Sequence, residues 1–212
     1  MPIVKKRNNK QIVKHKKKQH KNIVIPFITR LMQDGLNHLF FYDSVSRESV
    51  DELIRDLMTI QNHSYGSDIM TGDHIKVNPT AIVLHIHSYG GEVYAGLEAL
   101  RAIEACTTVP VHTVVDGIAA SAATWLAIAG KRRYITKHGH MLIHEVISGQ
   151  NGEVKWSDTK TNYKSLKTMM KTIKDIYTAR TPLKAKELDT ILSRDLYWDA
   201  RQCKKHLGMN IL

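Results

Sequence analysis

The chain has 212 residues, 42% of them hydrophobic and 24% charged, with 12 glycines and 5 prolines. This length suits one domain with an appendage, and this composition excludes a collagen-like, wholly disordered or membrane-embedded protein. Its 2 cysteines, Cys106 and Cys203, lie too far apart for a disulfide framework, so we expect inert thiols in a reducing compartment such as the cytoplasm.

The net charge of +11 is concentrated at the start of the chain. Residues 1–22 hold nine Lys or Arg and no acid, and the remaining 22 basic residues face 20 acidic ones. Blocks of like charge are usually disordered, so we expect a disordered basic arm at residues 1–22 and a folded domain at residues 23–212. The nearly neutral domain argues against nucleic-acid binding. The longest apolar span, residues 119–129, is shorter than the ~20 residues of a membrane helix, so we expect no membrane attachment.

The first half of the chain alternates between apolar strands and helical patterns. In order, we expect a strand at 37–42, a helix over 46–60, a polar loop at 61–80, a strand at 81–87, a glycine turn at 88–91, a helix at 93–103 and a strand at 109–115. Apolar residues three and four apart indicate helices, and nearly continuous apolar runs indicate buried strands. Two successive strand-helix-strand units predict an α/β domain.

The second half continues this alternation. We expect a turn at Gly117 into an Ala-rich helix at 119–129, strands at 133–135 and 141–143, a hairpin turn at 151–152, a long helix at 157–179, and a short helix capped by Asp199 and closed by Gly208. The long helix has an apolar stripe that includes Ile173 and Tyr177. The stripe indicates a packing face, and it is longer than one domain of this size needs to bury, so we expect it to contact other subunits.

Ser121 follows a buried strand and a glycine, and only small residues surround it. If it begins a helix, the N–H groups beside its hydroxyl can stabilise negative charge, which suits a nucleophile. A small serine could instead serve only close helix packing. The turn Ser88-Tyr89-Gly90-Gly91 favours the first interpretation, because open α/β sheets bind ligands at the carboxyl ends of their strands and glycines let an N–H face a substrate carbonyl.

A nucleophilic serine needs a base and a group that orients the base. His144 ends an apolar strand soon after Ser121, and histidine is the natural base near neutrality because an imidazole in water has a pKa of ~6.5. The downstream candidates for the orienting carboxylate are Asp189, Asp195 and Asp199. Because Asp199 is expected to cap a helix, Asp195 is the better third member.

Several motifs together resemble the proteolytic subunit of the Clp protease family. They are Gly-x-Ala-Ala-Ser at 117–121, the Gly-Gly turn at 90–91, Ile-His at 143–144 and Arg-Asp-x-aromatic-x-x-Ala at 194–200. The order Ser121, His144, Asp195 and the intervals of 23 and 51 residues are also similar to that family. The resemblance covers residues 37–212.

The resemblance implies a crotonase-like α/β fold with a long protruding handle helix, in a serine endopeptidase that hydrolyses unfolded polypeptides or peptides inside an oligomeric chamber. Ser121 would be the nucleophile, His144 the general base and Asp195 its orienter, with the backbone N–H groups of Gly91 and Ala122 as the oxyanion hole. It also implies heptameric rings, stacked through the long helix as a tetradecamer, and an ATP-dependent unfoldase as partner.

The chain departs from the usual family pattern near these residues. Tyr89 stands where proline is usual, Ala122 where methionine is frequent, and Glu145 where glutamine is usual. The expected oxyanion donors are main-chain N–H groups, so we expect them to be retained. Strand alternation predicts that Glu145 points to the face opposite His144.

Three other functions remain open from the residues. A crotonase-type acyl-thioester enzyme also binds an oxyanion with paired N–H groups, although it would not need Ser121, His144 and Asp195 together. A serine-lysine peptidase would use Lys131 or Lys137 as its base. A catalytically silent ring subunit would assemble without chemistry.

The 12 histidines raise the question of a metal. His85-x-His87 and His138-x-His140 are pairs of the kind that metal sites use. No cysteine stands at ligand spacing and there is no HExxH motif, so we expect neither a metal nor another cofactor.

Overall fold

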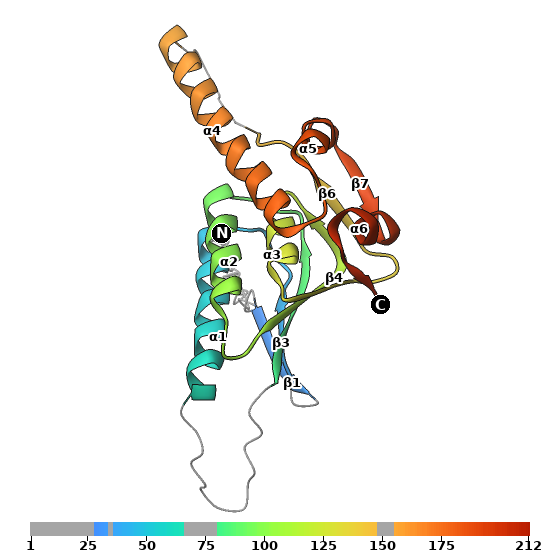
Figure 1. Cartoon of the computed structure of the whole chain (residues 1–212). Coiled ribbons are helices and arrows are strands. Elements are labelled where there is room, and N and C mark those ends of the chain that lie inside the picture. The colour runs from blue at the N-terminus through green and yellow to red at the C-terminus, as the bar shows by residue number, and fades with distance from the viewer. Residues whose placement is uncertain (1–27, 34–35, 66–79, 148–154) are drawn as a thin grey trace, which may run out of the picture.

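A computed structural model describes residues 28–33, 36–65, 80–147 and 155–212, and Figure 1 shows how their elements are arranged. The expected basic arm, residues 66–79 of the expected loop and the expected turn at 151–152 lie outside the described residues. The helices are α1 (Arg47–Tyr65), α2 (Val93–Ala105), α3 (Ala123–Ala129), α4 (Trp156–Arg180), α5 (Ala185–Leu192) and α6 (Ala200–Leu207). The strands are β1 (Ile28–Gln33), β2 (Leu36–Phe41), β3 (Ala81–Ser88), β4 (Val111–Ala120), β5 (Arg132–Ile135), β6 (His140–Ile143), β7 (Leu196–Asp199) and β8 (Asn210–Ile211).

The strands form one mixed sheet with a parallel centre. Its order is β1-β2-β3-β4-β5-β8, with β6 paired to the end of β4 and β7 paired to β6. Neighbours from β2 to β5 are parallel, as are β4 and β6, whereas β1 and β7 are antiparallel to their partners. Helices α1, α2 and α3 each connect two successive parallel strands. The expectation of an α/β fold built from repeated strand-helix units is therefore confirmed.

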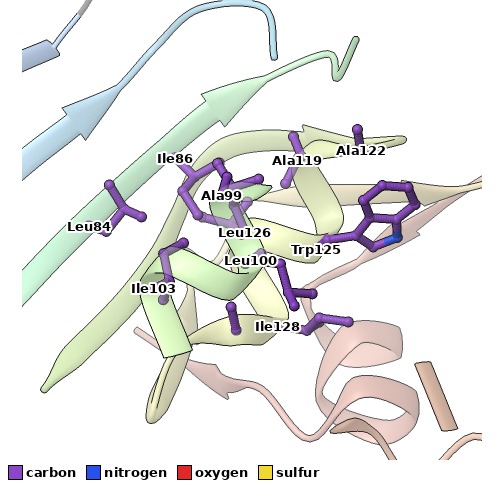
Figure 2. Packing of buried hydrophobic residues seen from close by; sticks show 14 of the residues in the cluster. Leu84, Ile86, Ala99, Leu100, Ile103, Ala119, Ala122, Trp125, Leu126 and Ile128 are labelled. Carbon is purple, nitrogen blue, oxygen red and sulfur yellow. The ribbon is translucent and has the colours of Figure 1, made fainter. Parts of the chain in front are cut away.

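Alternate residues of the central strands face the helices. Leu39, Ile86 and Val115 are fully buried in one apolar cluster that also contains side chains of α1, α2 and α3. Figure 2 shows side chains of β3, α2 and α3 meeting in this cluster, among them Leu84 and Leu126. Burying one large apolar side chain contributes about 1.5–3 kcal/mol, so this packing holds the helices against the sheet.

The expected helix at 119–129 begins later than its sequence indicates. Gly117 does not turn the chain but lies inside β4, and α3 starts only at Ala123. The reason is pairing on both sides: Ala119 is the register partner of Ser88 in β3 and of Met141 in β6. A run of alanines has high helix propensity, but two neighbouring strands override it.

The long helix α4 extends beyond the expected bounds at both ends. Its inner residues Ile173, Ile176 and Tyr177 are buried in the subunit's own core, whereas Trp156 and Tyr163 in its outer part are 81% and 66% exposed. Figure 1 shows this outer part projecting away from the sheet. The expectation that Ile173 and Tyr177 contact another subunit is wrong, because the helix needs both to pack against its own domain.

Other elements depend on contacts that the sequence pattern does not show. The sequence does not predict β1, α5, β7 or β8. Helix α1 also continues through residues 61–65 of the expected loop, and the amide of Gln61 donates to the carbonyl of Val109 at 2.7 Å.

None of the described helices combines the length and hydropathy needed to cross a bilayer.

Candidate active site

Ser121 lies in a strained turn between β4 and α3. Its φ is +54°, and it is the one non-glycine among the described residues with a positive φ. The Ser121 N–H donates to the carbonyl of Leu142 at 2.9 Å, and the Ser121 carbonyl accepts from the Thr124 N–H at 3.0 Å and the Thr124 hydroxyl at 2.6 Å. Such a conformation costs on the order of 1–3 kcal/mol and persists only where surrounding contacts hold it. A sharp strand-to-helix turn is also how some hydrolases present a nucleophilic hydroxyl.

The glycine turn that the sequence singles out packs directly against Ser121. Gly90 has a φ of +91°, and a Cβ added there would lie 2.5 Å from the Ala120 carbonyl oxygen and 2.6 Å from the Ser121 Cβ. Gly91 has a φ of +154°, and a Cβ added there would lie 2.2 Å from the carbonyl oxygen of Val45. Only glycine fits either position, so the close approach of the two turns depends on these residues.

Two backbone donors near Ser121 have no partner within the described part of the chain. The Val45 N–H donates to the Gly90 carbonyl at 2.9 Å, and the Glu92 N–H donates to the Val45 carbonyl at 2.7 Å. These bonds hold the turn at both sides of Gly91, whose own N–H bonds to none of the described residues; the same holds for the N–H of Ala122. Both N–H groups are available to a ligand, as an oxyanion hole requires.

His144 lies at the same edge of the sheet as Ser121. It directly follows β6, which is parallel to β4, and the two strands reach this edge at their carboxyl ends. Its side chain is half-buried, and the next residue is fixed because the Glu145 N–H donates to the Leu192 carbonyl at 2.9 Å. Glu145 itself is exposed.

Asp195 comes to this edge through β7. Leu196 is the register partner of Ile143 in the antiparallel pair of β6 and β7, so Asp195 and His144 are the next residues of the same ladder. Asp195 is exposed. Sequence spacing alone could not have shown this proximity, which depends on the pairing of β6 with β7.

The two competing aspartates are engaged elsewhere. The Asp199 carboxylate accepts from the Gln202 N–H at 2.8 Å as the cap of α6, and Gly208 closes that helix with a φ of +69°, so the expected cap and closure are confirmed. Asp189 forms an ion pair with Lys174. Of the three aspartates, Asp195 alone has no such contact among the described residues.

The three candidate side chains share one edge but are not joined. In the described residues, no hydrogen bond connects the Ser121 hydroxyl with the His144 ring, or that ring with the Asp195 carboxylate. Catalytic hydrogen bonds are often long without substrate and shorten when it binds.

The alternative bases lie at a different place. The Lys131 N–H donates to the carbonyl of Val111, the first residue of β4. Ser121 follows the last residue of that ten-residue strand, so about 30 Å of extended chain separates the two positions. Lys137 is exposed in the connection before β6, at the amino end of that strand. Neither lysine lies at the edge that holds Ser121.

The cysteines do not compete as nucleophiles. Burial raises the pKa of Cys106 to about 11 and that of Cys203 to about 12. Both thiols therefore stay protonated near neutrality, and a protonated thiol is a poor nucleophile.

His85, one member of the His85-x-His87 pair, belongs to a hydrogen-bonded cluster on the sheet. His85 Nδ1 lies 2.9 Å from the Asp116 carboxylate and its Nε2 lies 3.0 Å from His38, while the Tyr42 hydroxyl also donates to Asp116. Burial opposes ionisation of Asp116, but hydrogen bonds from His85 and Tyr42 outweigh it and hold the pKa of Asp116 below its ordinary value. Among the described residues, no three His, Cys, Asp or Glu side chains are placed to hold a metal ion.

A cavity of about 400 Å³ borders the chain just after His144. Glu145 and Val146 form one wall, and α4 and α5 form the others. Its apolar lining comes from Val146, Leu166, Met170 and Leu192, with Tyr163, Lys167, Glu145 and the Lys174–Asp189 pair around it. The cavity can accept a side chain next to the candidate base.

Comparison with known proteins identifies the family. The family model for Clp protease matches residues 19–209. The ATP-dependent Clp protease proteolytic subunit of Streptococcus mutans is 30% identical over 169 residues, which are 78% of this chain and 86% of the relative. Subunit 1 of the same protease from Chlamydia muridarum is 27% identical over 177 residues, 82% of this chain and 84% of the relative. This chain therefore belongs to the Clp protease family of serine peptidases.

Proposed function

We propose that this chain is a serine endopeptidase that cleaves unfolded polypeptides or peptides with a triad of Ser121, His144 and Asp195. The observation that supports this most is the strained Ser121 turn, packed against a glycine turn with two unbonded N–H groups beside it. Strain and unsatisfied donors at one place are typical of a site built for chemistry rather than for stability.

Each group has a distinct task in the proposed reaction. His144 removes the proton from the Ser121 hydroxyl as its oxygen attacks the scissile carbonyl, and then gives that proton to the leaving amine. Asp195 accepts a hydrogen bond from the other ring nitrogen and stabilises the imidazolium. The N–H groups of Gly91 and Ala122 donate to the oxyanion of the tetrahedral intermediate. The cavity beside His144 supports a polypeptide substrate, because its mixed apolar and charged lining can hold a side chain.

Labelling of the assembled protein with a fluorophosphonate tests this function. We expect a single adduct on Ser121, located by mass spectrometry, because the hydroxyl is activated only within the site. A His144→Ala variant should label far more slowly, and a Lys131→Ala variant should label as the wild type does. An unlabelled Ser121 would favour the silent ring subunit or the acyl-thioester enzyme.

We further propose that the outer part of α4 joins two heptameric rings into a tetradecamer that encloses the active sites, with an ATP-dependent unfoldase as partner. The exposed Trp156 and Tyr163 support this, since large aromatic side chains favour interfaces. Native mass spectrometry should show fourteen subunits for the wild type.

Variants of the exposed helix make this assembly testable. Trp156→Glu and Tyr163→Glu together should split the assembly into single rings without unfolding the subunit, because they place charges in the interface but not in the core. Ile173→Glu is the contrasting variant and should unfold the subunit, since its side chain is 3% exposed within it. A strictly monomeric wild type with full peptidase activity would contradict the proposed assembly.

A further inference from the structure

A buried chain of hydroxyl groups connects α4 to the backbone of Ser121. The Thr124 hydroxyl lies 2.6 Å from the Ser121 carbonyl oxygen and 2.5 Å from the Tyr177 hydroxyl. Thr124, in the first turn of α3, is 0% exposed, and Tyr177 on α4 is 2% exposed. The inner end of the long helix is thus bonded to the turn that holds the candidate nucleophile.

The direction of both hydrogen bonds follows from the number of protons that each group can donate. A threonine hydroxyl has one proton, and a carbonyl oxygen can only accept. Thr124 therefore donates to Ser121, and the Tyr177 hydroxyl must donate to Thr124. Burial raises the pKa of Tyr177, so its hydroxyl keeps the proton that this bond requires.

The peptide group at the end of this chain is shared with a candidate oxyanion donor. The carbonyl of Ser121 and the N–H of Ala122 belong to one planar trans peptide, so they point in opposite directions. Thr124 supplies both hydrogen bonds to that carbonyl, one from its N–H and one from its hydroxyl. Whatever fixes the carbonyl therefore also fixes where the Ala122 N–H points, and bonds to the carbonyl strengthen the N–H as a donor through mutual polarisation.

We propose that Thr124 and Tyr177 are positioning residues that orient the Ala122 N–H toward the oxyanion. Through them, this orientation depends on how α4 packs against the rest of the subunit. The inference rests on the proposed function of Ser121 and Ala122. Both residues act through the Ser121–Ala122 peptide and neither touches the substrate.

The chain offers a matched control at the other end of α3. The hydroxyl of Thr113 donates to the Ala127 carbonyl at 2.6 Å, and Thr113 is also 0% exposed. Thr113→Val and Thr124→Val each remove one buried hydroxyl bonded to a backbone carbonyl of the same short segment. They differ in that only Thr124 bonds to the peptide beside the nucleophile.

The experiment compares four variants of the full chain with the wild type: Thr124→Val, Tyr177→Phe, Thr124→Ser and Thr113→Val. Peptide hydrolysis gives kcat and KM, thermal unfolding gives Tm, and a peptide aldehyde, which forms a tetrahedral adduct, gives an inhibition constant. Removing one oxyanion donor costs about 10²–10³ in kcat, and a misdirected donor should cost less. We expect Thr124→Val and Tyr177→Phe to lower kcat by roughly 10–100-fold with KM changed by less than about threefold.

Three further results separate positioning from general stability. The aldehyde should bind more weakly by the same factor as kcat falls, because it too needs the oxyanion donor. Thr124→Ser, which restores the hydroxyl, should recover most of the activity. Tyr177→Phe added to Thr124→Val should cause no further loss of kcat, because Thr124→Val already removes the hydroxyl through which Tyr177 acts.

Contrary outcomes are distinct from one another. Unchanged kcat in Thr124→Val and Tyr177→Phe, with an active wild type, would overturn this inference alone. An equal loss in Thr113→Val would also overturn it, because the effect would then be general destabilisation. A wild type that neither hydrolyses peptides nor labels at Ser121 would overturn the proposed function and this inference together.

Discussion

The two ends of β4 both pair with neighbouring parallel strands, yet the backbone groups at the two ends are hydrogen-bonded very differently. At the amino end, Val111 is the register partner of Ile82 in β3, its carbonyl accepts from the Lys131 N–H at 2.8 Å, and the Thr113 hydroxyl donates to the Ala127 carbonyl. The described backbone there has no positive φ outside glycine. That end has the ordinary construction of a buried parallel strand.

The carboxyl end departs from that construction in three ways. Ser121 has a positive φ, Gly90 packs so closely that any side chain would overlap Ser121, and the N–H of Ala122 is unbonded within the described residues. These features lie at the edge of the sheet that also holds His144 and Asp195. The difference supports the proposal that the carboxyl end of the strand carries the active site, and the following substitutions test it.

The largest difference in peptide turnover should be between a variant of Ser121, which follows the carboxyl end of β4, and a variant of Lys131, which bonds to its amino end. Ser121→Ala should lower peptide turnover by roughly 10⁵–10⁶, because the other triad members cannot act without a nucleophile. Lys131→Ala should leave turnover within about twofold, as for exposed positions away from special features. Peptide hydrolysis by intact assemblies measures both, and comparable losses would remove the distinction between the ends.

The next contrast is between two aspartates near the carboxyl edge. Asp195→Asn should lower turnover by about 10⁴, since the amide cannot hold the working tautomer of His144. Asp199→Asn should have little effect on either turnover or stability, because asparagine caps helices about as well as aspartate. If Asp199→Asn were the damaging change and Asp195→Asn the mild one, the assignment of the third member would be wrong.

A third contrast uses two glycines with positive φ. Gly90→Ala should lower turnover by roughly 10², because its Cβ pushes Ser121 away from the proposed donors and a displacement of about 1 Å has a cost of that order. Gly208→Ala introduces similar backbone strain, but the nearest atom to its Cβ would be 3.9 Å away. It should lower Tm without changing kcat. Equal effects on kcat would show that strain alone, and not crowding of Ser121, matters.

The smallest effect on catalysis should come from the start of the chain. We propose that residues 1–22 form a solvated arm, so deleting them should leave small-peptide hydrolysis within about twofold. Acidic unfolded substrates should lose more than basic ones, and this preference should fade with salt, because the Debye length is only about 10 Å at 0.1 M. Equal rates for both substrates at two ionic strengths, with and without the arm, would show that the arm does not steer substrates.

Much of the site could be recognised from short-range patterns. Ser121, His144 and the Gly90–Gly91 turn each follow a strand that the apolar pattern predicts, and parallel strands bring their carboxyl ends to one edge. The cap at Asp199 and the closing Gly208 were also predictable, because capping depends on side chains within one helical turn. These features depend on local chemistry, which is why the sequence by itself determined them.

Other features were decided only by the tertiary structure. The start of α3 was set by strands on both sides of β4, against the helix propensity of its alanines. The pairing of β6 with β7 brought Asp195 to the same edge of the sheet as His144, and the Tyr177 hydroxyl reached Thr124 from 53 residues away in the sequence. Such contacts leave no periodic trace in the sequence, because each depends on where a distant element packs.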